Sequence, residues 1–346
     1  MKYYCLLLVL FIASCRNTDG KVIHNAGTTI NINGFTIITD TISTSKKEIV
    51  FPELKYRDNY YCQSYSKDSL GYYYPSGFYI IDATYNLKKV VGIPEYENLG
   101  DKSNMYVRHD SIVVKSAYNT NSSSYLDEKN MKWETIKTTD DVVFEDNDYY
   151  VTSLDYGEWG AATWFKDKKT GIEYEISEIL PPEINKFNGA YYLISPGEIN
   201  IVDDPKLLQN VGKDVYKSFL GVDKIGAFNN RKRSNKSKAI RNLFSRKITY
   251  EVEKSFHIGF SFIHNNSIFF VVSDSAKTYI AKVDERKLVP LAIIGKNLQT
   301  VKNGNHYRNS YLNKTIKFYN TTNELSGLME IKDDKILMHY FKNPHK

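Results

Sequence analysis

The residues of this chain that could do chemistry do not stand at spacings typical of a catalytic or metal site. His109 lies beside Asp110, a pair that could act as a general base, but no glycine-flanked serine elbow accompanies it. No zinc-binding histidine motif and no phosphate-binding or dinucleotide-binding glycine pattern occurs. The acidic run 145–148 lacks the alternating ligands and the distal glutamate of a calcium loop, which favours a hairpin turn. The sequence therefore predicts no catalytic residue, no metal and no cofactor.

The strongest chemical signal is Cys15, near the start of the chain. Lys2 precedes an apolar run over residues 6–12 that is too short to span a bilayer, and Ala13 and Ser14 lead directly into the cysteine. This order is typical of an export signal with a small-residue cleavage site. An ordinary secretory signal or a short membrane anchor would explain the apolar run but not the position of the cysteine.

The segment Ile12-Ala13-Ser14-Cys15 resembles the lipobox of bacterial lipoproteins, in which a lipid is attached to the cysteine and cleavage occurs just before it. The resemblance implies that residues 1–14 are a signal peptide and that acyl chains such as palmitate hold Cys15 in a membrane. Arg16 follows, and a residue other than Asp at this place resembles the outer-membrane sorting pattern of Gram-negative bacteria. We expect an outer-membrane lipid anchor, facing the periplasm or the cell surface.

The excess of positive charge lies entirely in one segment. The formal net charge is +6, and residues 231–247 hold eight basic side chains and no acidic one. We expect an exposed basic patch, because so many cations cannot be buried without partners. It could contact anionic lipid headgroups, dock an acidic partner or be a solvated loop; export argues against nucleic acid. The basic residues are Arg231, Lys232, Arg233, Lys236, Lys238, Arg241, Arg246 and Lys247.

Short apolar and aromatic runs bounded by Asn, Asp, Gly or Ser predict an all-β protein from about residue 48 onward. The 28 Tyr and 17 Phe residues favour strands, where aromatic rings pack across pleated neighbours. Residues 15–47 are expected to be a lipidated tether. Once Cys5 is removed and Cys15 is lipidated, Cys62 has no partner for an intramolecular disulfide.

Turn residues recur at intervals typical of propeller blades. Successive turns lie 38, 41, 77 and 47 residues apart, at Asp110, Asp148, Gly189, Asn266 and Asn313. We interpret the interval of 77 as two units with one turn obscured. Strands that end at Asp127, Asp167 and Asp284 occupy comparable places in the repeat.

These features predict a single β-propeller over residues 48–343 with six or seven blades, and a β-sandwich or two β domains is the alternative. In pattern and size the chain resembles the propeller lipoproteins of Bacteroidota-type bacteria.

One segment departs from the β pattern. Asp204-Pro205 is an N-cap followed by a first-turn proline, which predicts a partly helical insertion over residues 204–247. Apolar residues follow at helical spacing, namely Leu207, Leu208, Val211, Val215 and Phe219, and Ile240, Leu243 and Phe244 would share one side of a helix.

The segment Ser153-Leu154-Asp155-Tyr156-Gly157-Glu158-Trp159 resembles the Asp box of sialidase-like propellers, a non-catalytic turn between two blade strands. Its tryptophan comes one position early and the threonine is missing, so a generic hairpin turn is favoured. Tyr156, Trp159 and Trp164 could stack on a sugar or a peptide, although packing between blades is the commoner role of such residues.

These observations predict a lipid-anchored, non-enzymatic binding or scaffolding module of the bacterial cell envelope, with a protein or glycan partner. A propeller-type carbohydrate-active hydrolase and a periplasmic immunity or inhibitor protein are the alternatives. The sequence does not indicate an oligomeric state.

Lipidation at Cys15 can be tested by metabolic labelling with a palmitate analogue. The wild type should incorporate the label and Cys15→Ala should not, because only the thiol at that position meets the lipobox pattern. Cys62→Ala is the matched control and should label like the wild type. Equal labelling of Cys15→Ala would refute the assignment.

Overall fold

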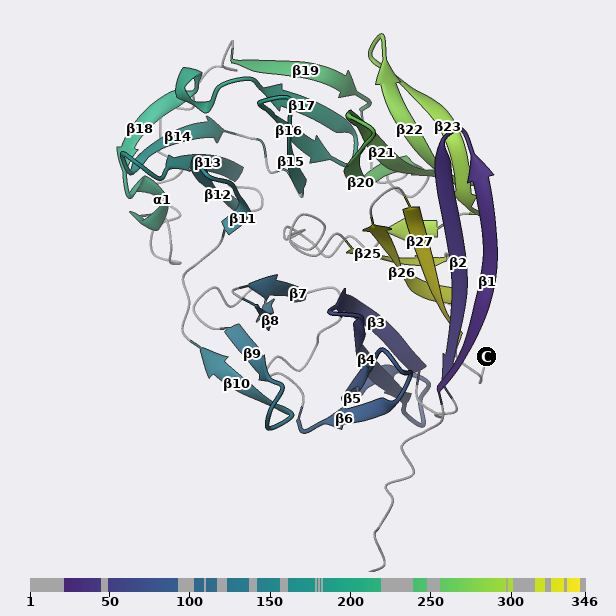
Figure 1. The fold of residues 1–346 in the computed structure, drawn as a ribbon. Helices are drawn as coiled ribbons and strands as arrows, with labels where there is room; N and C mark the ends of the chain where they lie inside the picture. The colour runs from purple at the N-terminus through teal and green to yellow at the C-terminus, as the bar shows by residue number, and fades with distance from the viewer. Residues whose placement is uncertain are drawn as a thin grey trace, which may run out of the picture.

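The protein is a six-bladed, all-β propeller. A computed structural model describes residues 22–44, 49–92, 103–108, 110–116, 123–136, 142–155, 161–177, 179, 181, 183–218, 239–247, 256–296, 298–300, 315–320, 325–332 and 335–342. Figure 1 shows the sheets arranged around a common centre. The first strands of several neighbouring blades contact each other, which places them on the inside of the ring.

The first three blades follow one another along the chain, each an antiparallel sheet. Blade 1 contains β3 (Ile49–Tyr56), β4 (Asn59–Lys67), β5 (Tyr73–Ile81) and β6 (Leu87–Val90). Blade 2 contains β7 (Ser103–Arg108), β8 (Ser111–Ser116), β9 (Ser123–Asp127) and β10 (Lys132–Ile136). Blade 3 contains β11 (Val142–Glu145), β12 (Tyr149–Asp155), β13 (Ala161–Asp167), β14 (Ile172–Ser177) and, at its edge, β18 (Gln209–Lys213).

The last three blades include the one that closes the ring. Blade 4 contains β15 (Glu183–Phe187), β16 (Ala190–Ser195), β17 (Glu198–Val202) and β19 (Ile240–Ser245). Blade 5 contains β20 (Phe256–His264), β21 (Ser267–Asp274), β22 (Thr278–Asp284) and β23 (Lys287–Gly295). Blade 6 contains β24 (Leu298–Thr300), β25 (Thr315–Asn320), β26 (Leu325–Lys332), β27 (Lys335–Lys342), β2 (Phe35–Thr44) and β1 (Val22–Ile32).

The predicted repeat is confirmed at the turns that the structure describes. Asp110, Asp148, Gly189 and Asn266 each lie in the hairpin between the first and second strands of a blade. Asn313 lies outside the described residues. The interpretation of the 77-residue interval as two units is wrong, because it spans one blade. In blade 4 the chain leaves the sheet after β17 and returns only at β19.

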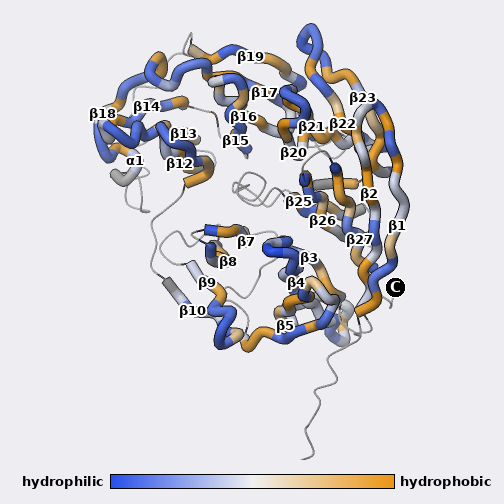
Figure 2. Tube along the Cα trace, in the orientation of Figure 1, coloured by the Kyte–Doolittle hydropathy of each residue, from blue (hydrophilic) through white to orange (hydrophobic). Residues whose placement is uncertain are grey.

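The third strands also end as predicted, at Asp127, Asp167 and Asp284 in blades 2, 3 and 5. The carboxylate of Asp127 accepts hydrogen bonds from the backbone N–H groups of Lys129 and Asn130, so it closes a local turn. Figure 2 shows that the hairpin between β22 and β23 is hydrophilic at its tip, as expected of a solvated turn.

Apolar side chains pack mainly between neighbouring blades. One cluster joins blades 1 and 2 through residues such as Phe78 and Met105, and another joins blades 4 and 5 through Ile199 and Phe270. Each blade therefore covers an apolar face of the next one, so no single blade could be stable alone.

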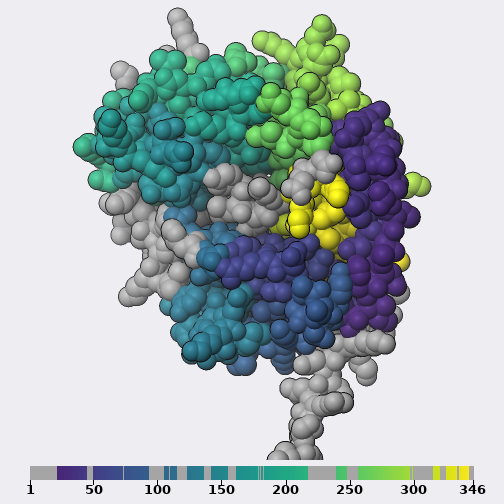
Figure 3. Space-filling model, in the orientation of Figure 1, coloured from purple at the N-terminus to yellow at the C-terminus, as the bar shows by residue number. Residues whose placement is uncertain are grey.

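An N-terminal hairpin closes the ring. β2 pairs in parallel with β27, from Thr36 opposite Lys335 to Ser43 opposite Lys342, and β1 pairs with the other edge of β2. Figure 3 shows this purple hairpin lying across the outside of the yellow blade 6, between green blade 5 and blue blade 1. Residues 22–44 were expected to belong to the tether; that expectation is wrong, because they form β1 and β2, and Phe35, Ile37 and Ile42 of β2 are buried.

The expected helical insertion is also largely wrong. Helix is confined to a 3₁₀ turn at Pro205–Leu207 and to α1 (Val215–Ser218) within the described part of 204–247. Residues 209–213 form β18, which pairs with β14, and Gly212 has a φ of +98°, which breaks a helical pattern at that point. Ile240, Leu243 and Phe244 lie on strand β19 rather than on one side of a helix.

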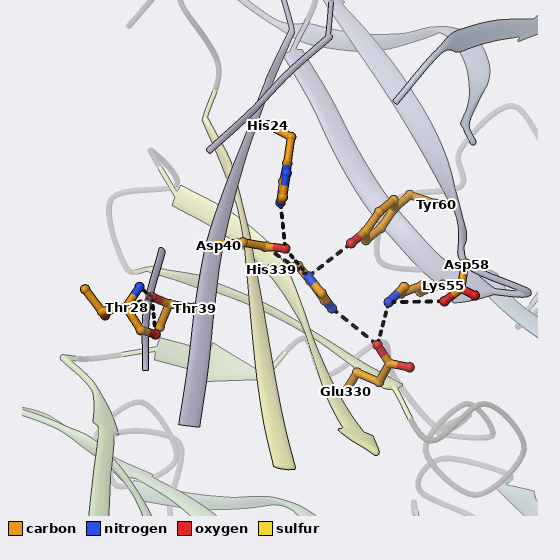
Figure 4. Close-up of polar contacts among 9 residues, drawn as sticks. All are labelled: His24, Thr28, Thr39, Asp40, Lys55, Asp58, Tyr60, Glu330 and His339. Carbon is orange, nitrogen blue, oxygen red and sulfur yellow. Dashed lines mark hydrogen bonds and ion pairs between the residues drawn. The ribbon is translucent and has the colours of Figure 1, made fainter. Parts of the chain in front are cut away.

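A buried polar network holds the closing hairpin to its neighbours (Figure 4). His339 on β27 lies at its centre, with Nδ1 2.9 Å from Asp40 Oδ1 on β2 and Nε2 3.3 Å from Glu330 Oε2 on β26. Blade 1 joins through Tyr60 Oη, 3.0 Å from His339 Nδ1, and through Lys55 Nζ, 2.7 Å from Glu330 Oε2.

The network favours the charged forms of His339, Glu330 and Asp40. Burial alone would lower the pKa of His339, but its hydrogen bonds to Asp40 and Glu330 raise that pKa above its ordinary value. Burial would raise the pKa of Glu330, yet His339 and Lys55 bring it down to about 2. The pKa of Asp40 is lowered in the same way, by His339 and His24 against the effect of burial.

The stability of the closed ring should therefore depend on pH. A histidine with a raised pKa contributes stability that is present below its unfolded pKa and is lost as pH rises through the folded value. The two carboxylates contribute stability that is present above their unfolded pKa values and is lost on acidification. Thermal unfolding should show greatest stability in mildly acidic buffer.

His339→Gln should lower the free energy of unfolding by about 3 kcal/mol at pH 6, because it removes the buried cation that Asp40 and Glu330 share and leaves them with His24 and Lys55 alone. The variant should also lose less stability than the wild type as the pH rises above neutrality, because the titrating histidine is gone. His24→Gln is the control, since His24 is the more exposed partner of Asp40, and should cost under about 1 kcal/mol. A His339→Gln protein that melts like the wild type at pH 6 would contradict this account.

Candidate functional site

The hairpins of blades 3 and 4 bring polar side chains to one face of the ring. Because strands alternate in direction, the hairpin between strands one and two lies on the same face as the hairpin between strands three and four. A cleft of about 600 Å³ opens there. Its lining residues are Asn147, Asp148, Tyr149, Asp167, Lys168, Lys169, Lys186, Gly189, Tyr191, Asp203, Asp204, Pro205 and Lys206.

Asp146 does not line the cleft itself, but its carboxylate holds four of the residues that do. Its Oδ1 accepts hydrogen bonds from the backbone N–H groups of Asp148 and Tyr149, both at 2.8 Å, which fixes the β11–β12 turn. Its Oδ2 accepts hydrogen bonds from Lys186 Nζ and Tyr191 Oη of blade 4, both at 2.7 Å. One carboxylate therefore joins a turn of blade 3 to the first two strands of blade 4.

These contacts set the charge states of the wall. Burial alone would raise the pKa of Asp146, but the hydrogen bonds from Lys186 and Tyr191 hold it below the ordinary value. Burial would lower the pKa of Lys186, and its bonds to Asp146 and Asp148 raise it instead. Burial and the nearby Asp204 raise the pKa of Tyr149 to about 12. The wall thus holds an ion pair beside two neutral phenols at physiological pH.

The opposite wall comes from the turn after β13 and from the chain that leaves β17. Asp167 Oδ1 accepts hydrogen bonds from the backbone N–H groups of Lys169 and Thr170, at 2.9 and 2.8 Å. These bonds, led by that of Thr170, lower the pKa of Asp167. Asp204 Oδ1 accepts from the backbone N–H of Lys206 at 2.9 Å and begins the 3₁₀ turn.

The cleft has a buried floor, an exposed rim and a balanced charge. Tyr149 and Tyr191 are almost fully buried, whereas Asp148, Asp203 and Lys206 each expose more than half of their side chains. The lining residues include four aspartates and four lysines. Such a surface offers many hydrogen-bond donors and acceptors without strongly favouring either sign of charge.

Of the three residues predicted to bind a ligand, the structure describes only Trp164. Trp164 is fully buried, and its Nε1 donates to Glu175 Oε2 at 2.7 Å, so it packs inside blade 3 and does not face a ligand. Tyr156 and Trp159 lie outside the described residues, as do Cys15 and His109. Of the segment that resembles an Asp box, the structure describes Ser153, Leu154 and Asp155, which lie on β12 with Ser153 opposite Thr163; the residues of its expected turn lie outside the described residues.

The basic patch is described only in part. Arg231, Lys232, Arg233, Lys236 and Lys238 lie outside the described residues. Arg241 on β19 donates to Asp203 Oδ1 at 2.9 Å, and the guanidinium of Arg246 lies 4.3 Å from the centre of the Phe256 ring. Lys247 is exposed. Two of the predicted patch residues are thus engaged with the fold.

Sequence reasoning missed Lys186, Tyr191 and the segment 203–206 as site residues. The recurrent aspartates at the ends of third strands were the available signal, because equivalent turns must lie on one face.

Over the described residues, no group of three side chains is placed to hold a metal ion, and no helix is long and apolar enough to cross a membrane.

Comparison with known proteins gives structural likenesses only. No protein-family model matches the chain, and no curated protein is detectably similar in sequence. A proposed 6-phosphogluconolactonase from Bacteroides fragilis is 11% identical, with a TM-score of 0.33, and the alignment covers 94% of this chain and 99% of that one. A second proposed 6-phosphogluconolactonase, from Bacteroides uniformis, is also 11% identical, with a TM-score of 0.33 and coverage of 93% and 95%.

A protein from Lactobacillus plantarum is 8% identical, with a TM-score of 0.32 and coverage of 93% and 99%. At such identities a likeness concerns the fold and not the activity.

The role of Asp146 can be tested by stability. Asp146→Ala should lower the free energy of unfolding by about 2 kcal/mol, because it removes bonds that join blades 3 and 4 and leaves the Tyr191 hydroxyl without its acceptor. Asp203→Ala is the control; it breaks a solvent-exposed pair with Arg241 and should cost under about 1 kcal/mol. Denaturant unfolding of both variants measures the difference, and equal costs would contradict the assignment.

Proposed function

We propose that the chain is a lipid-anchored, non-enzymatic binding module of the bacterial cell envelope, and that its cleft between blades 3 and 4 binds a polar, uncharged glycan. The observation that carries the proposal is the composition of the cleft: paired lysines and aspartates around a neutral floor. Sugar hydroxyls both donate and accept hydrogen bonds, so they complement a wall that presents ammonium and carboxylate groups side by side.

The rigidity of the cleft favours binding. The carboxylates of Asp146, Asp167 and Asp204 each accept backbone N–H bonds, which fix them before a ligand arrives. Side chains that are already held lose little conformational freedom on binding, so less of the interaction energy is spent on ordering them. The cleft therefore suits a ligand recognised by its shape and by several hydrogen bonds.

The same bonds argue for binding rather than acid catalysis. A catalytic acid needs a carboxyl group that keeps its proton near neutral pH, and hydrogen bonds to the charged form oppose this. Asp146 and Asp167 both have lowered pKa values. Their carboxylates are suited to holding a turn or accepting a hydroxyl group.

The envelope location rests on the signal that ends at Cys15, with Arg16 after it. Export and lipidation would place the cleft among surface and periplasmic polysaccharides. The outer membrane is the membrane we propose, on its periplasmic face or at the cell surface.

Binding can be tested on a microarray of neutral and acidic oligosaccharides, followed by calorimetric titration of the glycans retained. Asp148→Ala and Lys206→Ala remove exposed rim groups and should each weaken binding of a neutral glycan by about tenfold, which corresponds to about 1.4 kcal/mol. Lys282→Ala is the control, because Lys282 is an exposed lysine of blade 5.

The dissociation constant should change little with salt, since an uncharged ligand makes no long-range ionic contact. Retention of no neutral glycan, or equal affinity of the two rim variants and the wild type, would refute the proposal. Binding of acidic glycans alone, with strong salt dependence, would assign the cleft to a different ligand class.

A further inference from the structure

One turn of blade 1 exposes large apolar side chains to an unusual degree. Leu70 is 80% exposed and Tyr72 is 71% exposed, the two largest values among the large hydrophobic residues that the structure describes. Tyr74, on β5 just after the turn, is 49% exposed. Single exposed apolar residues are ordinary, but three within five positions form a local apolar surface.

The backbone of this turn is firmly held. Asp68 Oδ1 accepts hydrogen bonds from the backbone N–H groups of Leu70 and Tyr72, at 2.9 and 2.8 Å. The Asp68 N–H donates to the Tyr72 carbonyl at 2.9 Å, and Gly71 supplies the positive φ that the turn needs. The exposed side chains therefore project from a fixed scaffold.

The turn lies on the side of the ring where the chain enters the fold. Val22, the first residue of β1, packs against a cluster that includes Val50 of β3, and Val50 pairs with Ser64 of β4. From Ser64 to Leu70 the chain advances six residues, roughly 20 Å at the rise of a strand. Figure 1 shows β1 beginning beside blade 1.

The remaining chain between this point and the proposed anchor is short. Cys15 precedes Val22 by seven residues, which span at most about 25 Å even when fully extended. A tether of the predicted length, up to residue 47, would have left the orientation of the propeller free. Because β1 begins at Val22, the rim of blade 1 must stay close to the membrane that holds the lipid.

We infer that the turn from Asp68 to Tyr74 is a membrane contact, in which Leu70 enters the acyl region and Tyr72 and Tyr74 lie at the headgroups of the bilayer that carries the Cys15 anchor. The inference rests on the lipidation in the proposed function and adds the orientation of the protein. Tyrosine rings favour the interface of a bilayer, where the ring is shielded and the hydroxyl stays hydrated. The Lys67 stem runs beside Gly71, which brings an ammonium group to the level of lipid phosphates.

The test places a fluorophore at the turn of the lipidated full chain. Cys62 is fully buried and burial raises the pKa of its thiol, so it stays unlabelled in the folded protein. Leu70→Cys is labelled with the environment-sensitive dye NBD and reconstituted into vesicles of phosphatidylethanolamine and phosphatidylglycerol. Leu207→Cys is the matched control, because Leu207 is 66% exposed and lies between β17 and β18, across the ring from blade 1.

The dye at position 70 should show a blue-shifted, brighter emission that spin-labelled lipids quench, and the dye at position 207 should show neither. Adding Tyr72→Asp to the position-70 variant should return the emission to that of position 207, because a charge at the interface opposes insertion. Both labelled positions are exposed, and unchanged thermal melting confirms that each variant folds.

Flotation of the protein with the vesicles separates the two ways in which the experiment can fail. A protein that does not float refutes the Cys15 anchor and with it this inference. A protein that floats, but whose dyes at positions 70 and 207 behave alike, overturns the membrane contact alone and leaves the proposed anchor intact.

Discussion

The fold depends on closure of the ring by strands from opposite ends of the sequence. A ring of blades buries each apolar face against the next, so an open ring would leave two faces in water. Here β2 is paired in parallel with β27, and the β1–β2 hairpin contacts the blades on both sides of blade 6. Phe35 packs with residues of blade 5, and Ile42 packs with residues of blade 1. One hairpin thereby fixes three consecutive blades.

Closure is reinforced by charges as well as by apolar contact. Asp40, His339 and Glu330 come from three adjacent strands of blade 6, and Lys55 and Tyr60 come from blade 1. Burying such groups is costly unless every one finds its partner, which only one register of β2 against β27 provides. The network therefore specifies the closing register more than it adds net stability, and an incorrectly paired strand would leave charges buried and unmatched.

The sequence predicted the features that depend on local chemistry and missed those that depend on distant partners. Turn residues such as Asp110, Asp148 and Asp167 reveal the repeat, because hairpins between short strands require the same residue types in each blade. The β1–β2 hairpin and β18 were missed because β2 pairs with β27 at the other end of the sequence, and β18 pairs with β14 of the preceding blade. Gly212 was a local sign against a helix. Over one short window, however, the spacing of the apolar residues around it fits a helix and a strand equally well.

The cleft arises where the repeat is broken. After β17 the chain crosses from blade 4 to the edge of blade 3 as β18, then returns to blade 4 as β19. Residues 203–206, at the start of this excursion, line one part of the cleft, and Lys186, which Asp146 holds in place, lines another. Regular blades present nearly equivalent turns around the ring, so a distinct site needs an irregular element. The 77-residue interval was therefore the place in the sequence where a site was most to be expected, although the interval alone could not show which side chains would meet there.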